Sequence, residues 1–183
     1  PTASLAQSAS LSLEEMEDFY FKACLRNWPK AAKKMKELKK ILDGATKIEI
    51  IGEKTDLSLS FVNRTFAICA AEYNMPDGEI FSCPLETKTE GKVYFDFPSL
   101  RQGKMVKGAS FLFKKGKVVK FSAEENEDFL KQTLVIDKGV KTLGEFALGV
   151  NYDIQRFMYN TLFDEKIGGT IHLALGNAYP ENE

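Results

Sequence analysis

The stretch ASFLFKKGKVVKFSA limits the possible folds of this chain more than any other segment. Phe111 and Phe113 precede a Lys-Gly pair, and Val119 and Phe121 follow it. Alternation with a period of two is typical of a half-buried strand, and two such runs around a short Gly-containing break predict a β-hairpin. The fold must therefore contain antiparallel strands.

Two helices are predicted near the N-terminus. Ser12 followed by Glu15 has the spacing of a capping box, and apolar residues then recur at helical intervals, so a helix should cover about residues 12–26. The segment WPKAAKKMKELKKILDGA predicts a second helix, with Pro29 in its first turn and Gly44 just past its end.

The remaining segments alternate irregularly between strand and helix patterns. TKIEIIG with DLSLSF predicts a second hairpin, GKVYFDFP a strand, and TIHLALG the last strand. Ser122 with Glu125 repeats the capping-box spacing and predicts a helix over about 123–134, and YDIQRFMYNTLFD predicts a further helix. Because this order lacks the regular alternation of a parallel doubly wound sheet, we expect an α+β fold with a mixed, largely antiparallel sheet and flanking helices.

Charge and hydropathy exclude several classes of partner. Among 183 residues, 25 basic and 26 acidic side chains leave a net charge of -1, which gives no basis for binding nucleic acid or an anionic membrane. The lysines of the second predicted helix lie beside an intact apolar stripe without interleaved aromatic residues, so we interpret them as a solvated face. No run approaches the roughly 18 to 20 apolar residues of a membrane span, and the N-terminus lacks the pattern of a secretion signal. We expect a soluble chain that is not exported.

The cysteines indicate a reducing compartment. Cys24, Cys69 and Cys83 are odd in number, widely spaced and form no CxxC. Neither a disulfide framework nor a zinc cysteine cluster is predicted, and a cytoplasmic location is expected.

Three residues could carry chemistry, and each also has a structural explanation. Glu79 follows a Pro-Asp-Gly turn and could be an exposed acid, and Glu145 lies among apolar residues and could be an ion-paired strand residue. His172, the only histidine, lies in the strand-like IGGTIHLALGNAY and could be a hydrogen-bonded core residue. Two carboxylates and an imidazole are also the ligand types that suit zinc, cobalt or manganese. Their separations match no local metal motif, so spacing alone leaves both explanations open.

Several long segments together resemble a known family. NMPDGEIFSCP, LGEFALGVN and NTLFDEKIGGTIHLALGNAY are similar to signature segments of the thermophilic-type metallo-aminopeptidases, the aminopeptidase T and aminopeptidase S group. PTASLAQSASLSLEEMEDFYFKACLRNW resembles the segment that joins the family's N-terminal domain to its catalytic domain. By this resemblance Glu79, Glu145 and His172 take the positions of metal ligands around a two-metal centre, and Tyr179 that of a tyrosine lining the active site.

The resemblance implies a catalytic-domain fragment. Residues 1–45 would be a helical segment joining from a missing N-terminal domain, and residues 46–183 a metal-binding domain truncated at its C-terminus. The family completes its centre with a His-x-Asp segment beyond the NAYP stretch, so three of five expected ligands would be present. We therefore expect the chain alone to bind its divalent metals (Zn, Co, Mn or Mg) partially or not at all, and to be inactive or impaired. The intact parent would act on peptides with a free N-terminus and form a homodimer.

The implied reaction assigns roles to these residues. Two metals would share and acidify a water that attacks the first peptide carbonyl, with Glu145 as the bridging ligand and Tyr179 donating a hydrogen bond to the tetrahedral intermediate. Asp164, Glu165 and Lys166 could be a charge cluster at a helix end or could orient ligands or the substrate amine. The alternative function is a non-catalytic domain that binds peptide or metal.

Overall fold

The computed structural model describes residues 1–178, which divide into two compact units. The first unit comprises Pro1–Lys40, Ala67–Phe81 and Ala147–His172. The second comprises Ile41–Phe66, Ser82–Phe146 and the chain from Leu173 onward. Helices and strands both occur, and every strand pair of known register is antiparallel, which confirms the predicted α+β class.

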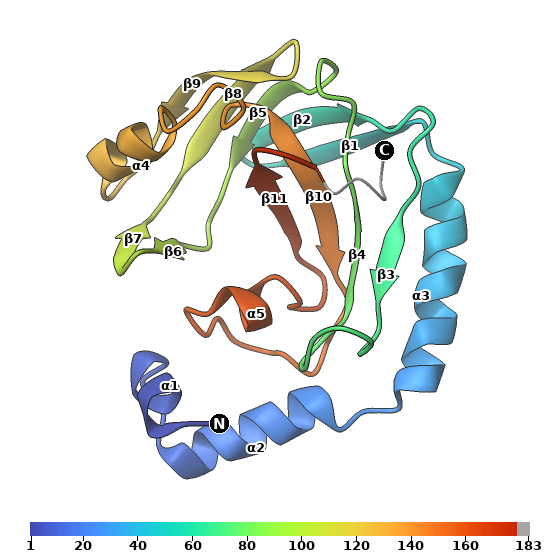
Figure 1. Cartoon of the computed structure of the whole chain (residues 1–183), viewed down its shortest axis with the longest axis vertical. Helices are drawn as coiled ribbons and strands as arrows, with labels where there is room; N and C mark the ends of the chain where they lie inside the picture. Colours follow the sequence, from blue (N-terminus) through green and yellow to red (C-terminus); the bar gives the residue numbers. More distant parts are fainter. Residues whose placement is uncertain (179–183) are drawn as a thin grey trace. The chain divides into compact units, whose positions relative to one another are not determined.

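The elements follow in chain order (Figure 1). The helices are α1 (Ala3–Ser8), α2 (Leu13–Cys24), α3 (Trp28–Asp43), α4 (Glu127–Thr133) and α5 (Thr161–Asp164). The strands are β1 (Lys47–Gly52), β2 (Thr55–Ser60), β3 (Ala67–Cys69), β4 (Glu79–Ser82), β5 (Glu90–Tyr94), β6 (Ser99–Arg101), β7 (Lys104–Val106), β8 (Ser110–Lys114), β9 (Lys117–Ser122), β10 (Leu143–Gly149) and β11 (Ile171–Leu175).

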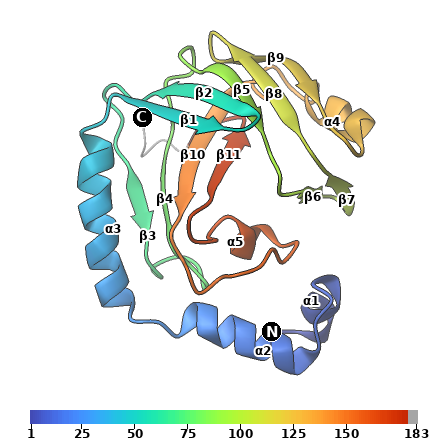
Figure 2. The same ribbon diagram turned by 180° about the vertical axis from the view of Figure 1, so that it is seen from behind.

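The second unit contains a five-stranded sheet with the order β1-β2-β5-β8-β9. Figure 2 shows these strands from behind, with β1 beside β2 and β8 beside β9. Both predicted hairpins are confirmed: Ile48 pairs with Leu59 in the first, and Phe111 with Phe121 in the second. Lys115 and Gly116 both have positive φ, as the tight turn of the second hairpin requires.

Apolar side chains on this unit's strands and loops form its core. Leu57, Leu59 and Phe113 have at most 1% of their surface exposed. The rings of Phe61 and Phe146 lie 5.7 Å apart, a separation typical of favourable aromatic pairs. A further sheet has the order β11-β10-β4-β3, and β6 pairs with β7 in a two-stranded ribbon.

In the first unit, α2 begins as predicted. The Ser12 hydroxyl accepts a hydrogen bond from the Glu15 backbone N–H, and the Glu15 carboxylate accepts one from the Ser12 N–H. This reciprocal capping satisfies two N–H groups that the first helical turn leaves unpaired. The buried face of α2 then carries Met16, which packs with Met158 and Phe163 in a hydrophobic cluster.

In the segment predicted as a helix over 123–134, the observed helix α4 begins later and is shorter than the capping-box spacing indicated. Ser122 is the last residue of β9, where it pairs with Ser110, and Glu125 forms a bridge with Lys107. Strand pairing therefore takes up both residues of the predicted cap, and α4 begins only at Glu127.

The long helix predicted over YDIQRFMYNTLFD was wrong: only α5 is helical. Its capping residue, Asn160, accepts a hydrogen bond from the Leu162 N–H. The Asp164 carboxylate accepts hydrogen bonds from the backbone N–H groups of Met158, at 2.6 Å, and Asn160, at 2.7 Å. These bonds stabilise a loop that packs Met158 onto α2. The apolar periodicity of YDIQRFMYNTLFD therefore reflects this packing and not a long helix.

Within residues 1–178, none of the helices combines the length and apolar character that crossing a membrane requires.

Candidate metal centre

The turn between β3 and β4 positions Glu79. Cys69 pairs with Glu79 across the two strands, and the Asp77 carboxylate closes the turn by accepting hydrogen bonds from the N–H groups of Ala71 and Gly78. Gly78 has a φ of +116°, and a Cβ there would lie 2.9 Å from the Asn151 Cβ, so only glycine fits. The turn thereby places Glu79 in the interior with 8% of its surface exposed.

A second segment, residues 165–168, brings two more charged groups to Glu79. The Asn151 N–H donates to the Lys166 carbonyl, and the Gly168 N–H donates to the Asn151 carbonyl. A Cβ on Gly149 would lie 2.2 Å from the Ile167 carbonyl oxygen, so this close approach depends on glycine. Since Glu165 and Lys166 follow directly after α5, the turn that ends the helix carries both side chains to the site.

Lys166 is an ammonium ion held inside the first unit. Its side chain has no exposed surface, and its Nζ lies 3.1 Å from Oε1 of Glu79 and is hydrogen-bonded to the Glu165 carboxylate. Burial disfavours the charged form, but the hydrogen bond and charge of Glu165, together with the charge of Glu79, outweigh it and raise the pKa of Lys166. Lys166 is therefore positively charged at neutral pH.

His172 faces the same carboxylate. Its Nδ1 lies 3.1 Å from the Glu165 carbonyl oxygen, and its Nε2 lies 3.6 Å from Oε2 of Glu79. A carbonyl oxygen only accepts, so Nδ1 carries the proton in this contact, and Nε2 is the ring nitrogen on the side of Glu79. This hydrogen bond is the kind that orients a metal-binding histidine.

Acidic groups outnumber basic ones at this site. Asp77, Glu79 and Glu165 face the single ammonium of Lys166. Burial raises the pKa of the Glu79 carboxyl, although the nearby Lys166 charge opposes this, and burial also raises the pKa of Asp77. An additional positive charge would therefore be stabilised here.

Two groups of donor atoms could hold a cation. In the first, one donor atom each from Glu79, Glu165 and His172 lie within 4.8 Å of one another, and in the second the same holds for Cys69, Asp77 and Glu79. Burial raises the pKa of the Cys69 thiol to about 12, and both Asp77 oxygens already accept backbone hydrogen bonds. A neutral thiol is a poor metal ligand, so the first group, which we call the Glu79 triad, is the stronger candidate.

The structure brings together two of the predicted ligands. Glu79 and His172 meet in the first unit, whereas Glu145 is half-buried on β10 in the second unit and its role stays a prediction. Tyr179 lies outside the described residues. Glu165 and Lys166 contact the site directly. In the sequence, the only indication of this was the run of charged residues after the predicted helix.

Comparison with known proteins agrees with the signature segments. Aminopeptidase 2 of Geobacillus stearothermophilus is 40% identical and Aminopeptidase T of Thermus aquaticus 36% identical, each over 113 residues. These alignments cover 60% of this chain, which spans about 27% of the length of either relative. The solved structure of wild-type AmpT from Thermus thermophilus matches with a TM-score of 0.78 at 27% identity, over 90% of this chain and 45% of that one. The family model for thermophilic metalloproteases (M29) matches residues 1–183, and the chain therefore belongs to the M29 family.

Proposed function

We propose that this chain forms part of a metal-dependent aminopeptidase, in which the Glu79 triad holds a divalent cation. The observation that carries the proposal is the convergence of three donor atoms within 4.8 Å, in a chain that matches the M29 family over residues 1–183. Two carboxylates and one imidazole are ligands that zinc, cobalt and manganese accept, and magnesium accepts the carboxylates.

The electrostatics of the triad support a cation. In the neutral form of His172, the Nε2 lone pair and the Glu79 carboxylate oxygen, 3.6 Å apart, repel each other, so the pair needs a positive charge: a proton on Nε2 or a cation between the two atoms. A divalent cation would supply that charge, and when bound it polarises a carbonyl oxygen and lowers the pKa of water.

The residues at the site either supply ligand atoms or hold those ligands in position. Glu79 on β4 and Glu165 after α5 contribute carboxylate oxygens, and the Glu165 carbonyl holds the His172 ring through Nδ1. Gly78 and Gly149 allow the close backbone contacts that fix these groups in place before any ligand arrives.

The resemblance supplies the finer parts of the proposal. Glu145 would bridge two metals, and Tyr179 would donate a hydrogen bond to the tetrahedral intermediate. The substrates would be peptides with a free N-terminus, and the intact parent would be a cytoplasmic homodimer.

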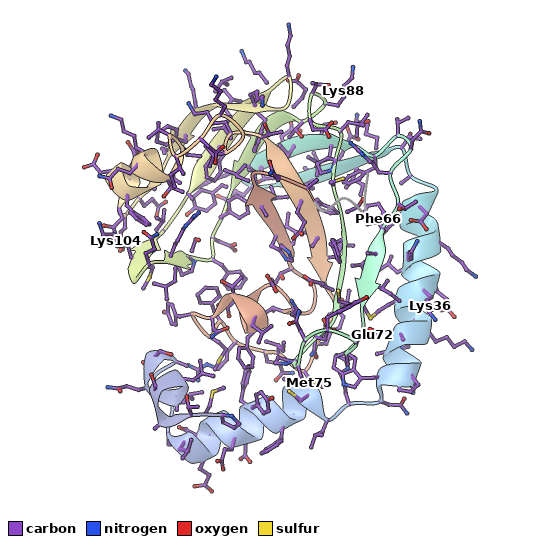
Figure 3. The ribbon with its side chains drawn as sticks, viewed as in Figure 1. Lys36, Phe66, Glu72, Met75, Lys88 and Lys104 are labelled. Carbon is purple, nitrogen blue, oxygen red and sulfur yellow. The ribbon has the colours of Figure 1, made fainter. Side chains whose placement is uncertain are left out.

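Cobalt titration tests the metal site. We expect metal-free protein to bind Co²⁺ with a calorimetric signal and visible absorption bands. We expect Glu79→Gln and His172→Ala each to weaken binding at least a hundredfold, because the first removes the negative charge of a ligand and the second removes the imidazole. Glu72→Gln is the control, since Glu72 is an exposed glutamate in the same β3–β4 loop (Figure 3). Cobalt binding that is unaffected by the Glu79 and His172 changes would refute the site.

Peptide binding to the cobalt-loaded protein tests the aminopeptidase assignment. A dipeptide with a free α-amine should shift the cobalt absorption bands, and its N-acetylated form should not, because acetylation removes the amine that such an enzyme recognises. Equal shifts with both dipeptides, or none with either, would contradict peptide recognition through the free N-terminus while leaving the metal site standing.

A further inference from the structure

Lys166 contacts the same carboxylates that would bind a cation in the proposed metal site. Its ammonium contacts the carboxylates of Glu79 and Glu165, two of the three members of the Glu79 triad. Among the described residues, it is the only lysine or arginine that is buried. A basic side chain thus already neutralises part of the charge that would attract a metal.

An ammonium and a divalent cation cannot share these two carboxylates without cost. Both are positive, and because Lys166 and Glu79 are buried their repulsion is screened less than it would be at the surface. The lone pairs that the Lys166 ammonium uses, on Oε1 of Glu79 and on Glu165, are unavailable to a metal.

We propose that Lys166 is an internal counter-cation that competes with the divalent metal for Glu79 and Glu165. The inference rests on the proposed metal site. Metal entry then requires the ammonium to leave at least one of the two carboxylates. Asp77, whose charge also interacts with Lys166, keeps a carboxylate near the displaced ammonium.

The same geometry predicts how the metal-free protein stays folded. Without Lys166, Glu79 and Glu165 would face each other with no positive charge between them, and a buried carboxylate without a partner strongly destabilises a fold. Lys166 therefore substitutes for the metal in the empty protein, at the expense of metal affinity.

The test compares two uncharged variants with a surface control. Lys166→Met removes the charge from a side chain of similar length, and Lys166→Gln keeps a hydrogen-bond donor for the carboxylates. Lys36→Met removes the same charge from an exposed position, where Lys36 extends away from α3 (Figure 3). Each protein is titrated with Co²⁺ by calorimetry, and its thermal unfolding is followed with EDTA and with Co²⁺.

Competition predicts opposite effects on affinity and on metal-free stability. Both Lys166 variants should bind Co²⁺ at least tenfold more tightly than the parent and should unfold at a lower temperature in EDTA. Co²⁺ should raise their unfolding temperature by more than it raises that of the parent. Lys36→Met should match the parent in all three measurements.

Equal or weaker cobalt binding by the Lys166 variants would overturn the proposal, and would instead make Lys166 a residue that positions the ligands. If the parent still lost affinity on Glu79→Gln, the metal site would stand without the competition. If neither Lys166 variant folded in EDTA, folding upon addition of Co²⁺ would support competition, and failure to fold with Co²⁺ would overturn it. Absence of binding in every protein would overturn both this inference and the metal site.

Discussion

Asn151→Ala should lower the free energy of unfolding by about 3 to 4 kcal/mol, because one buried side chain holds several backbone segments of the first unit. Its amide N–H groups donate to the carbonyls of Ala23, at 3.0 Å, and Asp77, at 2.9 Å. Its oxygen accepts from the Arg26 guanidinium and from the Asp153 N–H. Alanine would leave the carbonyls of Ala23 and Asp77 without these donors, whereas the Arg26 guanidinium would keep its ion pair with Asp153.

This change should also disturb the candidate metal centre. The Asp77 carbonyl that Asn151 holds lies two residues before Glu79, and the Asn151 backbone holds Lys166 and Gly168. Loss of the side chain therefore loosens the segment that carries Glu79, whereas the backbone hydrogen bonds to Lys166 and Gly168 remain.

Urea unfolding measures the effect of Asn151→Ala, with Asn74→Ala as the control. Asn74 is exposed in the loop between β3 and β4, so its replacement should change the free energy of unfolding by less than about 0.5 kcal/mol. Equal effects of the two substitutions would show that the Asn151 hydrogen bonds contribute nothing beyond those of a surface asparagine.

Phe163→Ala should lower the free energy of unfolding by about 3 to 5 kcal/mol, since it removes a whole ring from a packed interior. Phe163 is 2% exposed and packs with Met16 and Met158, and its ring centroid lies 5.6 Å from that of Phe19. Phe163 also anchors α5, and the turn after α5 carries Glu165.

The matched control for Phe163→Ala is Phe21→Ala on α2. Phe21 is 49% exposed and contacts the ring of Tyr20 at a centroid distance of 5.6 Å, so we expect a loss below about 1 kcal/mol. Phe163→Leu should fall between the two because it leaves a smaller cavity. A Phe163→Ala protein as stable as the Phe21→Ala protein would mean that α5 is not held by this cluster.

Elements whose stability comes from their own residues were predictable from the sequence. The two hairpins carry their alternation and their turn within one short segment, and the cap of α2 lies within four residues. The start of the helix predicted over 123–134 and the long helix predicted over YDIQRFMYNTLFD were wrong for the opposite reason. Lys107 and α2, both distant in sequence, decide the structure of those segments.

The candidate site divides in the same way. Glu79 follows a turn motif and His172 is a unique residue in a strand pattern, so both could be identified locally. The contact of Lys166 with Glu79 could not be predicted, because it joins residues 87 positions apart. It also depends on the close approach of the Ile167 backbone to Gly149. The buried role of Asn151 likewise depends on segments that only folding brings together.

X-ray absorption spectroscopy of the cobalt-loaded protein tests the central claim, binding of a cation by the Glu79 triad, most directly. The account predicts a first shell of nitrogen and oxygen atoms only, with the outer-shell scattering of one imidazole, because His172 is the single histidine of the chain. A sulfur shell at about 2.3 Å, as a thiolate ligand such as Cys69 would produce, or a spectrum without imidazole scattering, would contradict it.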